Sequence, residues 1–199
     1  STLGKVLKRL SGQGKGVLEV AVGGDEPAVY AIVDGAGLLR SPDGGKTWSP
    51  LRGDAPCVKS PFAVAVPPRD GKTVFAGVAA DGGGLWCSGD GGLTWRKCGD
   101  MAGVMASDDV EWITICAKDP KLIVAGHRAG RAVSVSGDGG GTWAARDLGA
   151  EMKAQIVFLV SDTRWAVASR AGGALRWTDD SGAHWTPAAG DADYFPGPL

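Results

Sequence analysis

The sequence predicts an all-β fold built from four successive units, each of four short antiparallel strands. One observation is that every copy of a short glycine-rich motif has three β-rich runs before it and a fourth after it. No helical pattern lies between these runs. The other observation is the recurrence of the motif itself. Its copies are SPDGGKTW (41–48), SGDGGLTW (88–95), SGDGGGTW (136–143) and the degenerate TDDSGAHW (178–185).

The spacing of the motif indicates the architecture. Its aligned aspartates are separated by 47, 48 and 42 residues, and self-similarity with a period of about 40 to 50 residues is typical of a propeller. A ligand-binding loop usually occurs once, so four copies favour a structural role. The prediction is a β-propeller of four four-stranded antiparallel blades over residues 17–190. An N-terminal extension (1–16) precedes it, and an extended C-terminal tail (191–199) follows.

The strands are assigned unit by unit. The first strand of each unit is almost entirely apolar, which predicts an innermost strand buried on both sides. The motif then lies in the hairpin that joins the third strand to the fourth. The predicted strands are 17–22, 28–33, 37–41 and 47–51; 61–66, 72–77, 84–88 and 94–98; 111–117, 121–126, 132–136 and 142–147; and 154–160, 164–169, 174–178 and 184–187.

Each position of the motif has a physical reason, which the second copy illustrates. Asp90 can accept hydrogen bonds from backbone N–H groups of its own turn, and Gly91 and Gly92 can adopt positive φ. Thr94 suits a strand, and Trp95 can fold into the seam between two blades. A calcium loop would need alternating oxygen ligands and a distant glutamate, and a phosphate loop would need a GK[ST] ending before a helix. Neither pattern is present, so no metal or cofactor is expected.

These residues resemble the Asp-box, or BNR, repeat, S-x-D-x-G-x-T-W. Three copies match every fixed position, whereas the fourth has Thr178 for the serine and His184 for the threonine. The resemblance covers roughly residues 17–187. The matching residues are Ser41, Asp43, Gly45, Thr47, Trp48, Ser88, Asp90, Gly92, Thr94, Trp95, Ser136, Asp138, Gly140, Thr142, Trp143, Asp180, Gly182 and Trp185.

The resemblance implies a propeller fold but leaves several functions open, because one fold hosts many activities. Proteins with this repeat include sialidases, xyloglucanases, sortilin-type receptors and assembly factors of photosynthetic membranes. A relation to the assembly factors implies protein partners in a larger complex, in an organelle lumen such as the thylakoid or outside the cell. A relation to the hydrolases implies glycan binding or glycoside hydrolysis, and this is the alternative.

The composition restricts the partners. The chain of 199 residues has 21 Lys and Arg, 22 Asp and Glu, and a formal net charge of −1. Such a balance gives no overall attraction to nucleic acid. Four cysteines show no metal-binding spacing. Cys87 and Cys98 flank the second motif on neighbouring predicted strands, so a disulfide between them and buried free thiols are both open for Cys57, Cys87, Cys98 and Cys116.

The catalytic groups of a glycosidase are not evident in the sequence. Sialidases use a tyrosine nucleophile, but Tyr30 lies in a predicted strand and Tyr194 in the tail. A hydrolase of another kind needs two carboxylates about 5–9 Å apart. Asp34 and Asp81 are one conceivable pair, although their loops are short. His127 is expected to be a polar surface residue, and no enzymatic activity is predicted.

The loops joining the second and third strands of each unit suggest a binding face. The first two units contribute Asp34 and Asp81, whereas the other two contribute Arg128, Arg131 and Arg170. A face that is acidic on one half and basic on the other suits a protein of complementary charge.

The two ends carry clustered apolar side chains that predict docking onto a partner. Leu3, Val6, Leu7 and Leu10 form a helical stripe beside Lys5, Lys8 and Arg9, which makes the N-terminal extension a candidate for peripheral membrane contact. The tail carries Tyr194 and Phe195 near two prolines. The predicted function is therefore a non-catalytic interaction or scaffold module, a subunit or assembly factor of a larger complex.

Overall fold

The computed structural model describes residues 16–24, 28–79, 83–99, 109–127, 132–149, 154–169 and 175–188. The chain divides into two compact units. The first comprises residues 1–98 and 108–113, and the second comprises residues 99–107 and 114–199.

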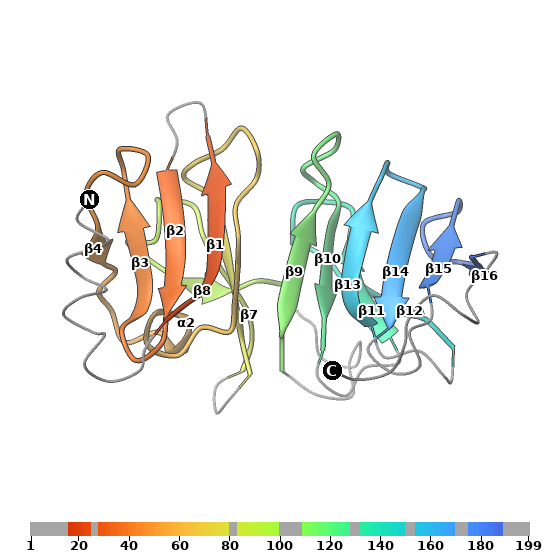
Figure 1. Ribbon diagram of the computed structural model, residues 1–199, viewed down its shortest axis with the longest axis horizontal. Coiled ribbons are helices and arrows are strands. Elements are labelled where there is room, and N and C mark those ends of the chain that lie inside the picture. The colour runs from red at the N-terminus through yellow and green to blue at the C-terminus, as the bar shows by residue number, and fades with distance from the viewer. Residues whose placement is uncertain are drawn as a thin grey trace. The chain divides into compact units, whose positions relative to one another are not determined.

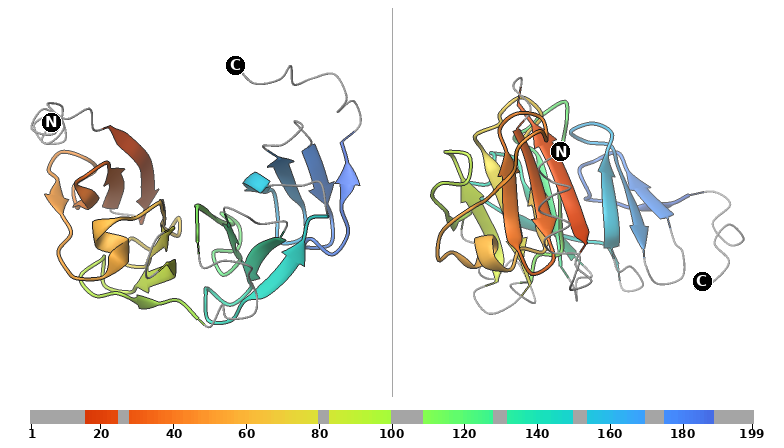
Figure 2. Two further views of the ribbon diagram at one scale, coloured as in Figure 1. Left: turned by 90° about the horizontal axis from the view of Figure 1, so that it is seen from below. Right: turned by 60° about the vertical axis from the view of Figure 1, so that its left-hand side comes forward.

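In the part of the chain that the structure describes, sixteen strands form four four-stranded sheets that follow one another along the chain (Figures 1 and 2). Within each sheet the strands lie in sequence order, and we call the sheets the first to the fourth. This arrangement confirms the predicted all-β fold of four-stranded antiparallel units. The strands are β1 (Val17–Gly23), β2 (Ala28–Val33), β3 (Gly37–Ser41) and β4 (Ser49–Pro50); β5 (Ala63–Ala65), β6 (Val74–Val78), β7 (Gly84–Ser88) and β8 (Arg96–Lys97); β9 (Trp112–Ile115), β10 (Ile123–Gly126), β11 (Ala132–Ser136) and β12 (Ala144–Asp147); and β13 (Ala154–Leu159), β14 (Trp165–Ser169), β15 (Leu175–Thr178) and β16 (Thr186–Pro187).

The fourth strand of each sheet begins later than the sequence pattern predicts. The predicted strand 47–51, for example, is observed only as Ser49–Pro50. The reason is that the threonine of the motif bonds to the turn rather than to the neighbouring strand. Thr47 donates from its backbone N and its Oγ1 to the Asp43 carboxylate, at 2.8 Å and 2.7 Å.

A single helical turn, α2 (Pro56–Lys59), joins the first and second sheets, so the prediction of no helix is wrong at this point. Proline at the first helical position is compatible with a helix, because its missing N–H has no partner there in any case. The turn buries Cys57 and Val58. Its carbonyls come very close to β3: a Cβ at Gly37, where φ is +76°, would lie 2.2 Å from the Val58 carbonyl oxygen.

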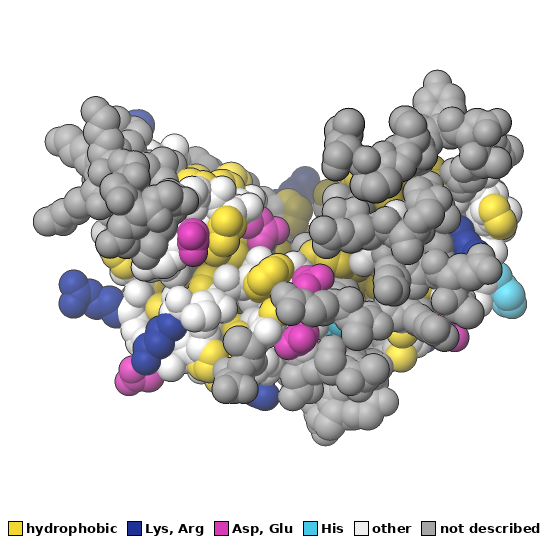
Figure 3. All heavy atoms as spheres, turned by 60° about the horizontal axis from the view of Figure 1, so that its bottom comes forward, with side chains coloured by type: hydrophobic (Ala, Val, Ile, Leu, Met, Phe, Trp, Pro, Cys, Tyr) yellow, Lys and Arg dark blue, Asp and Glu magenta, His cyan; other side chains and the backbone are white. Residues whose placement is uncertain are grey.

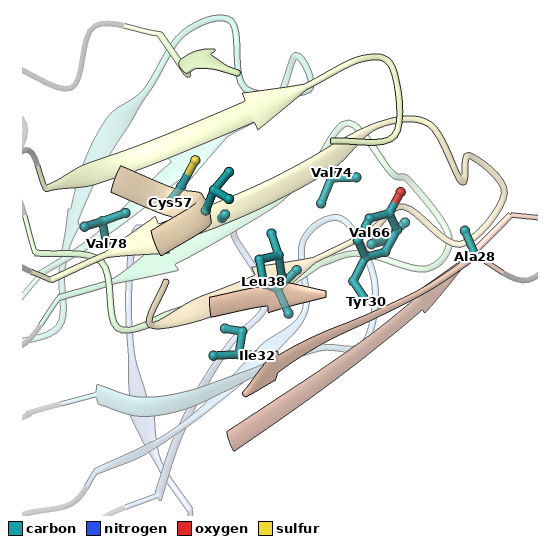
Figure 4. Packing of buried hydrophobic residues seen from close by; sticks show 11 residues of the cluster. Ala28, Tyr30, Ile32, Leu38, Cys57, Val66, Val74 and Val78 are labelled. Carbon is teal, nitrogen blue, oxygen red and sulfur yellow. The ribbon is translucent and has the colours of Figure 1, made fainter. Parts of the chain in front are cut away.

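The core of the first unit lies between its two sheets and α2 (Figure 4). β2 is buried along its whole length, as its sequence AVYAIV predicts for a strand covered on both faces. Tyr30 has no exposed surface, and its hydroxyl donates to the carbonyl of Gly71 at 3.1 Å. The cluster consists of Ala28, Tyr30, Ile32, Leu38, Cys57, Val58, Val64, Val66, Val74, Ala76 and Val78.

The first strand does not have the burial that its apolar sequence predicts. Only one face of β1 is turned inward, where Glu19 accepts a hydrogen bond from the backbone N of Val64 in the second sheet at 2.8 Å. On the other face Leu18, Val20 and Val22 are 65%, 52% and 57% exposed. The prediction that this strand is buried on both sides is therefore wrong, because the packing within the unit covers only alternate residues.

The second unit has its own core around Trp165, which has no exposed surface. The ring of Trp165 lies against that of Trp185, with centroids 6.4 Å apart and planes tilted by 56°. The third and fourth sheets are also joined by a hydrogen bond from Thr114 Oγ1 to the Val157 carbonyl at 3.2 Å. Among the described residues, no helix is long and apolar enough to cross a bilayer.

Candidate functional site

The four motif hairpins are built around one carboxylate each. In the second hairpin, Asp90 accepts hydrogen bonds from Ser88 Oγ at 2.7 Å, Thr94 N at 2.9 Å and Thr94 Oγ1 at 2.6 Å. The serine hydroxyl in turn accepts from Gly92 N at 2.8 Å. The first and third hairpins repeat these bonds around Asp43 and Asp138. The carboxylate therefore satisfies the N–H and hydroxyl donors of a tight turn.

The degenerate fourth hairpin reaches the same arrangement with different side chains. Thr178 Oγ1 replaces the serine hydroxyl and donates to Asp180 at 2.6 Å. His184 replaces the threonine, with its N at 2.9 Å and its Nδ1 at 2.6 Å from the same carboxylate. Ser181 stands where the other copies have glycine, and its φ is +59°. The turn geometry thus persists although the sequence has changed.

These bonds lower the pKa of every motif carboxyl. The pKa of Asp43 falls to about 2, mainly because of the backbone N–H of Thr47. The pKa values of Asp90, Asp138 and Asp180 are also held far below the usual range, with hydrogen bonds as the leading cause in each case. A carboxylate of such low pKa whose oxygens are occupied is unsuited to proton transfer near neutral pH. The motif carboxylates therefore use their oxygens to hold the turns together.

The motif tryptophans close the hairpins in two ways. In the first three copies the indole Nε1 donates to the carbonyl of the motif glycine, at 3.0 Å for Trp48 and Trp95 and 3.2 Å for Trp143. Trp185 instead donates to the Asp147 carbonyl of the third sheet at 3.1 Å. Trp48 and Trp143 are buried, whereas Trp95 and Trp185 are half-buried. The ring of Trp95 packs against the core of the first unit, as does Leu51 of the preceding sheet.

Most of the predicted binding face lies outside the described residues. Of its five members only Asp34 is described, on the exposed turn between β2 and β3, where its backbone N donates to the Gly16 carbonyl at 3.1 Å. The proposed carboxylate pair with Asp81 and the basic half of the face stay predictions. On the face shown in Figure 3, the described acidic and basic side chains are interspersed. The members outside the description are Asp81, Arg128, Arg131 and Arg170.

The predicted docking ends also lie outside the described residues, so their role stays a prediction. His127, in contrast, is described, and its expected surface position is wrong. It is only 7% exposed at the end of β10, and its Nε2 lies 3.2 Å from Ser134 Oγ on the neighbouring strand. The residues of the two ends are Leu3, Val6, Leu7, Leu10, Tyr194 and Phe195.

Several carboxylates outside the motif have similar structural roles. Asp70 accepts from the backbone N of Lys72 at 2.9 Å, in the turn between β5 and β6. Asp119 accepts from Lys121 N at 3.1 Å, and Asp147 accepts from Gly149 N at 2.8 Å. These acids stabilise turns. No group of three or more metal-ligating side chains occurs in the part of the chain that the structure describes.

Sequence reasoning missed a basic hollow of about 350 Å³ in the first unit, lined by Arg40, Arg69 and Lys72 with Asp70. The Arg40 Nε donates to the hydroxyl of the buried Tyr30 at 3.2 Å, and its guanidinium lies 6.0 Å from the tyrosine ring centre. No sequence signal links these residues, because Arg40 belongs to β3 and the others to a turn of the next sheet.

The described side chains also include an open apolar row, formed by Leu18, Val20 and Val22 of β1. These residues alternate along one strand, so they share one face. β1 is an edge strand, since β2 is its only neighbour in the sheet. A soluble protein rarely leaves adjacent aliphatic side chains open to water unless they meet a partner.

Solved structures with a similar fold are known. A GH74 enzyme from Niastella koreensis matches with 21% identity and a TM-score of 0.66, over 91% of this chain and 31% of the enzyme. The GH74 xyloglucanase from Xanthomonas campestris matches with 21% identity and a TM-score of 0.63, over 92% of this chain and 31% of the enzyme. The fold is that of a β-propeller. The resemblance to Asp-box propellers that the sequence suggested is thereby confirmed at the level of the fold.

A second kind of protein also has a similar fold. YCF48 bound to D1 peptide matches with 13% identity and a TM-score of 0.50, over 88% of this chain and 83% of that chain. No protein-family model and no curated protein matches the sequence. The chain spans about a third of the length of the GH74 enzymes. At these identities the likeness establishes the propeller fold alone.

Proposed function

We propose that this chain is a non-catalytic protein-interaction module, a subunit or assembly factor of a larger complex. The observation that supports the proposal most directly is the open aliphatic row of Leu18, Val20 and Val22 on β1, each more than half exposed. We name this row the β1 face. In the proposal the β1 face is the surface that a protein partner covers.

The β1 face has the properties of an interaction surface. Covering an aliphatic side chain that is now exposed stabilises an association by about 25 cal/mol for each Å² removed from water. The charged residue of the strand, Glu19, points to the opposite face and is hydrogen-bonded within the unit. Charge is therefore kept away from the row, as is usual in the central part of a protein interface.

The hydrolase alternative has less support. The motif carboxylates are occupied by their own turns, and so are those of Asp70, Asp119 and Asp147. A protein of this fold, YCF48, has been solved with a peptide bound, which favours a protein ligand by analogy of fold. A complex of a photosynthetic membrane stays the candidate that the sequence resemblance suggests.

The proposal is tested by charging the β1 face. We expect Val20→Asp to reduce co-purification of the native partner complex at least tenfold, because an apolar anchor in an interface contributes about 1–3 kcal/mol to binding. Leu93→Asp is the matched control, because Leu93 is 75% exposed and lies on the motif turn between β7 and β8 of the second sheet. Both variants should melt within about 2 °C of the wild type, because neither side chain is in the core.

Two outcomes would contradict the proposal. One is that Val20→Asp and Leu93→Asp retain partners equally well while both stay folded. The other is turnover of xyloglucan by the pure protein that is lost in Asp34→Asn, which would favour the hydrolase alternative.

A further inference from the structure

Two cysteines lie close together across the hairpin of the second sheet. Cys87 belongs to β7, and Cys98 directly follows β8. The backbone N of Cys98 donates to the Leu85 carbonyl at 2.8 Å, so Cys98 pairs with Leu85 across the two strands. Cys87 is two residues after Leu85 and therefore points to the same face as Cys98. Both are free thiols, 6% and 1% exposed.

Other copies of the hairpin bring the same two backbone positions together, but only the second copy has a cysteine at both. The same backbone pairing recurs in the first sheet, from Leu51 N to the Leu38 carbonyl at 2.9 Å. It recurs again in the fourth sheet, from Ala188 N to the Leu175 carbonyl at 3.0 Å. Only the second sheet places a thiol at both positions. The equivalent pairs are Arg40 and Leu51, Val135 and Arg146, and Trp177 and Ala188.

The two thiols are also joined by a hydrogen bond. A hydrogen bond from the Cys98 thiol lowers the pKa of Cys87 to about 7, with a smaller contribution from the nearby Arg96 guanidinium. Burial acts in the opposite direction on the neighbouring Cys57 and raises its pKa to about 12. Near neutral pH, Cys87 thus has a large thiolate fraction and Cys57 almost none. The thiolate is the nucleophile in disulfide exchange.

We propose that Cys87 and Cys98 are a dithiol–disulfide redox pair that covalently closes the second Asp-box hairpin when oxidised. The oxidant is a disulfide of the glutathione class. The Cys87 thiolate attacks one sulfur of that disulfide, forms a mixed disulfide and releases one glutathione thiolate. Cys98 then loses its proton, and its sulfur attacks the Cys87 sulfur and displaces the second glutathione thiolate. Two protein thiols are oxidised, and one external disulfide is reduced to two thiols.

The position of the pair gives the oxidation a structural consequence. The disulfide would enclose residues 88–97, which contain the whole second motif with its central Asp90. β8, the outer strand of this hairpin, has only two residues, and both are exposed. Such a short edge strand can open locally, which gives the oxidant access to two thiols that are otherwise covered. Oxidation would then hold this strand in place.

The test equilibrates the folded protein in buffers of defined ratios of reduced to oxidised glutathione, starting from the reduced and from the oxidised protein. Free thiols are alkylated at each ratio, and peptide mapping by mass spectrometry locates the disulfide. We expect two of the four thiols to disappear together and a peptide pair linked through Cys87 and Cys98. The melting temperature should rise by about 5 °C, because a short covalent loop restricts the unfolded chain.

Variants distinguish this pair from general thiol oxidation. Cys87→Ser and Cys98→Ser should each abolish the intramolecular disulfide and the rise in melting temperature, whereas Cys57→Ala and Cys116→Ala should retain both. The disulfide map of the wild-type protein tests the pairing even if a variant does not fold. Four alkylatable thiols at every ratio would overturn it, as would a disulfide through Cys57 or Cys116.

Discussion

A single aspartate organises each hairpin of this protein, and the tryptophan that follows it completes the turn. The aspartate collects two or more donors from within five residues, so its contacts are local. The tryptophan contacts differ between copies, since the indole of Trp185 bonds to the third sheet while that of Trp143 bonds to its own hairpin. The contribution of each tryptophan to stability should therefore depend on its burial and not on the motif.

We expect Trp143→Ala to lower the free energy of unfolding by about 3–5 kcal/mol, as is usual for a buried large aromatic residue. Trp185→Ala should cost about 1–3 kcal/mol, because its ring is half-buried. Urea unfolding followed by circular dichroism measures both values. Equal losses in the two variants would show that the motif itself, and not burial, sets the contribution.

At the scale of the elements, a close backbone approach holds α2 against β3. Gly37 adopts positive φ, and the Val58 carbonyl occupies the place that a Cβ would fill. This contact joins the turn between the first two sheets to the core of the first unit. A side chain at this position would both strain the backbone and displace the helix.

We expect Gly37→Ala to destabilise the protein by more than about 2 kcal/mol, because the left-handed conformation alone costs an alanine about 1–2 kcal/mol. Gly89→Ala is the control, since no atom lies within 4 Å of its added Cβ and its φ is not in the positive range. The control should change stability by less than about 1 kcal/mol. A comparable loss in both variants, measured in urea, would rule out the close approach as the cause.

The contact between the first two sheets contains a titratable group. Burial raises the pKa of Glu19, although the backbone N–H of Val64 partly offsets this effect. A carboxyl whose pKa is raised in the folded state binds its proton more tightly there than in the unfolded chain. Its contribution to stability is thus fully present below the unfolded pKa of about 4.3 and is lost as the pH rises through the folded pKa.

We therefore expect Glu19→Gln to remove the loss of stability that accompanies rising pH. The glutamine still offers a side-chain oxygen to Val64 N. The variant should have the same melting temperature as the wild type near pH 4 and a higher one at pH 7. Melting curves between pH 4 and pH 8 test this, and a difference that does not grow with pH would contradict the assignment.

At the scale of the whole molecule, the four motif carboxylates act in the same direction on stability. Each has a lowered pKa in the folded state, so the stability it contributes is present above the unfolded pKa of about 3.9 and is lost as the pH falls through the folded pKa. All four are at the surface, and solvent screens each effect. Because each of the four sheets carries one such carboxylate, low pH should destabilise all four sheets.

We expect the melting temperature to fall steeply below pH 4 and to continue falling to about pH 2. Asp138→Asn should lower the melting temperature at pH 7 and make the decline below pH 4 shallower, because one of the titrating groups is gone. A wild-type protein whose melting temperature is constant from pH 5 to pH 2 would contradict the proposed role of the carboxylates.

The number of sheets, the order of their strands and the positions of the four hairpins could be predicted from the sequence alone. These features are local: strand periodicity and turn chemistry depend on neighbours in the chain, so Asp43, Asp90, Asp138 and Asp180 could be recognised from their spacing. Most of the predicted binding face and both docking ends lie in loops and termini outside the described residues, and they stay predictions.

Which of these residues face water and which face one another depends on how the strands pack together. The apolar sequence of β1 does not show that Val20 is open, and the loop position of His127 does not show that it is buried. The basic hollow around Arg40 was equally hidden, whereas the sequence had already placed Cys87 and Cys98 on neighbouring strands and left their pairing open. The physical reason is that burial and side-chain contacts depend on packing between strands that are distant in sequence, and the local periodicity of one strand carries no information about its neighbours across the sheet.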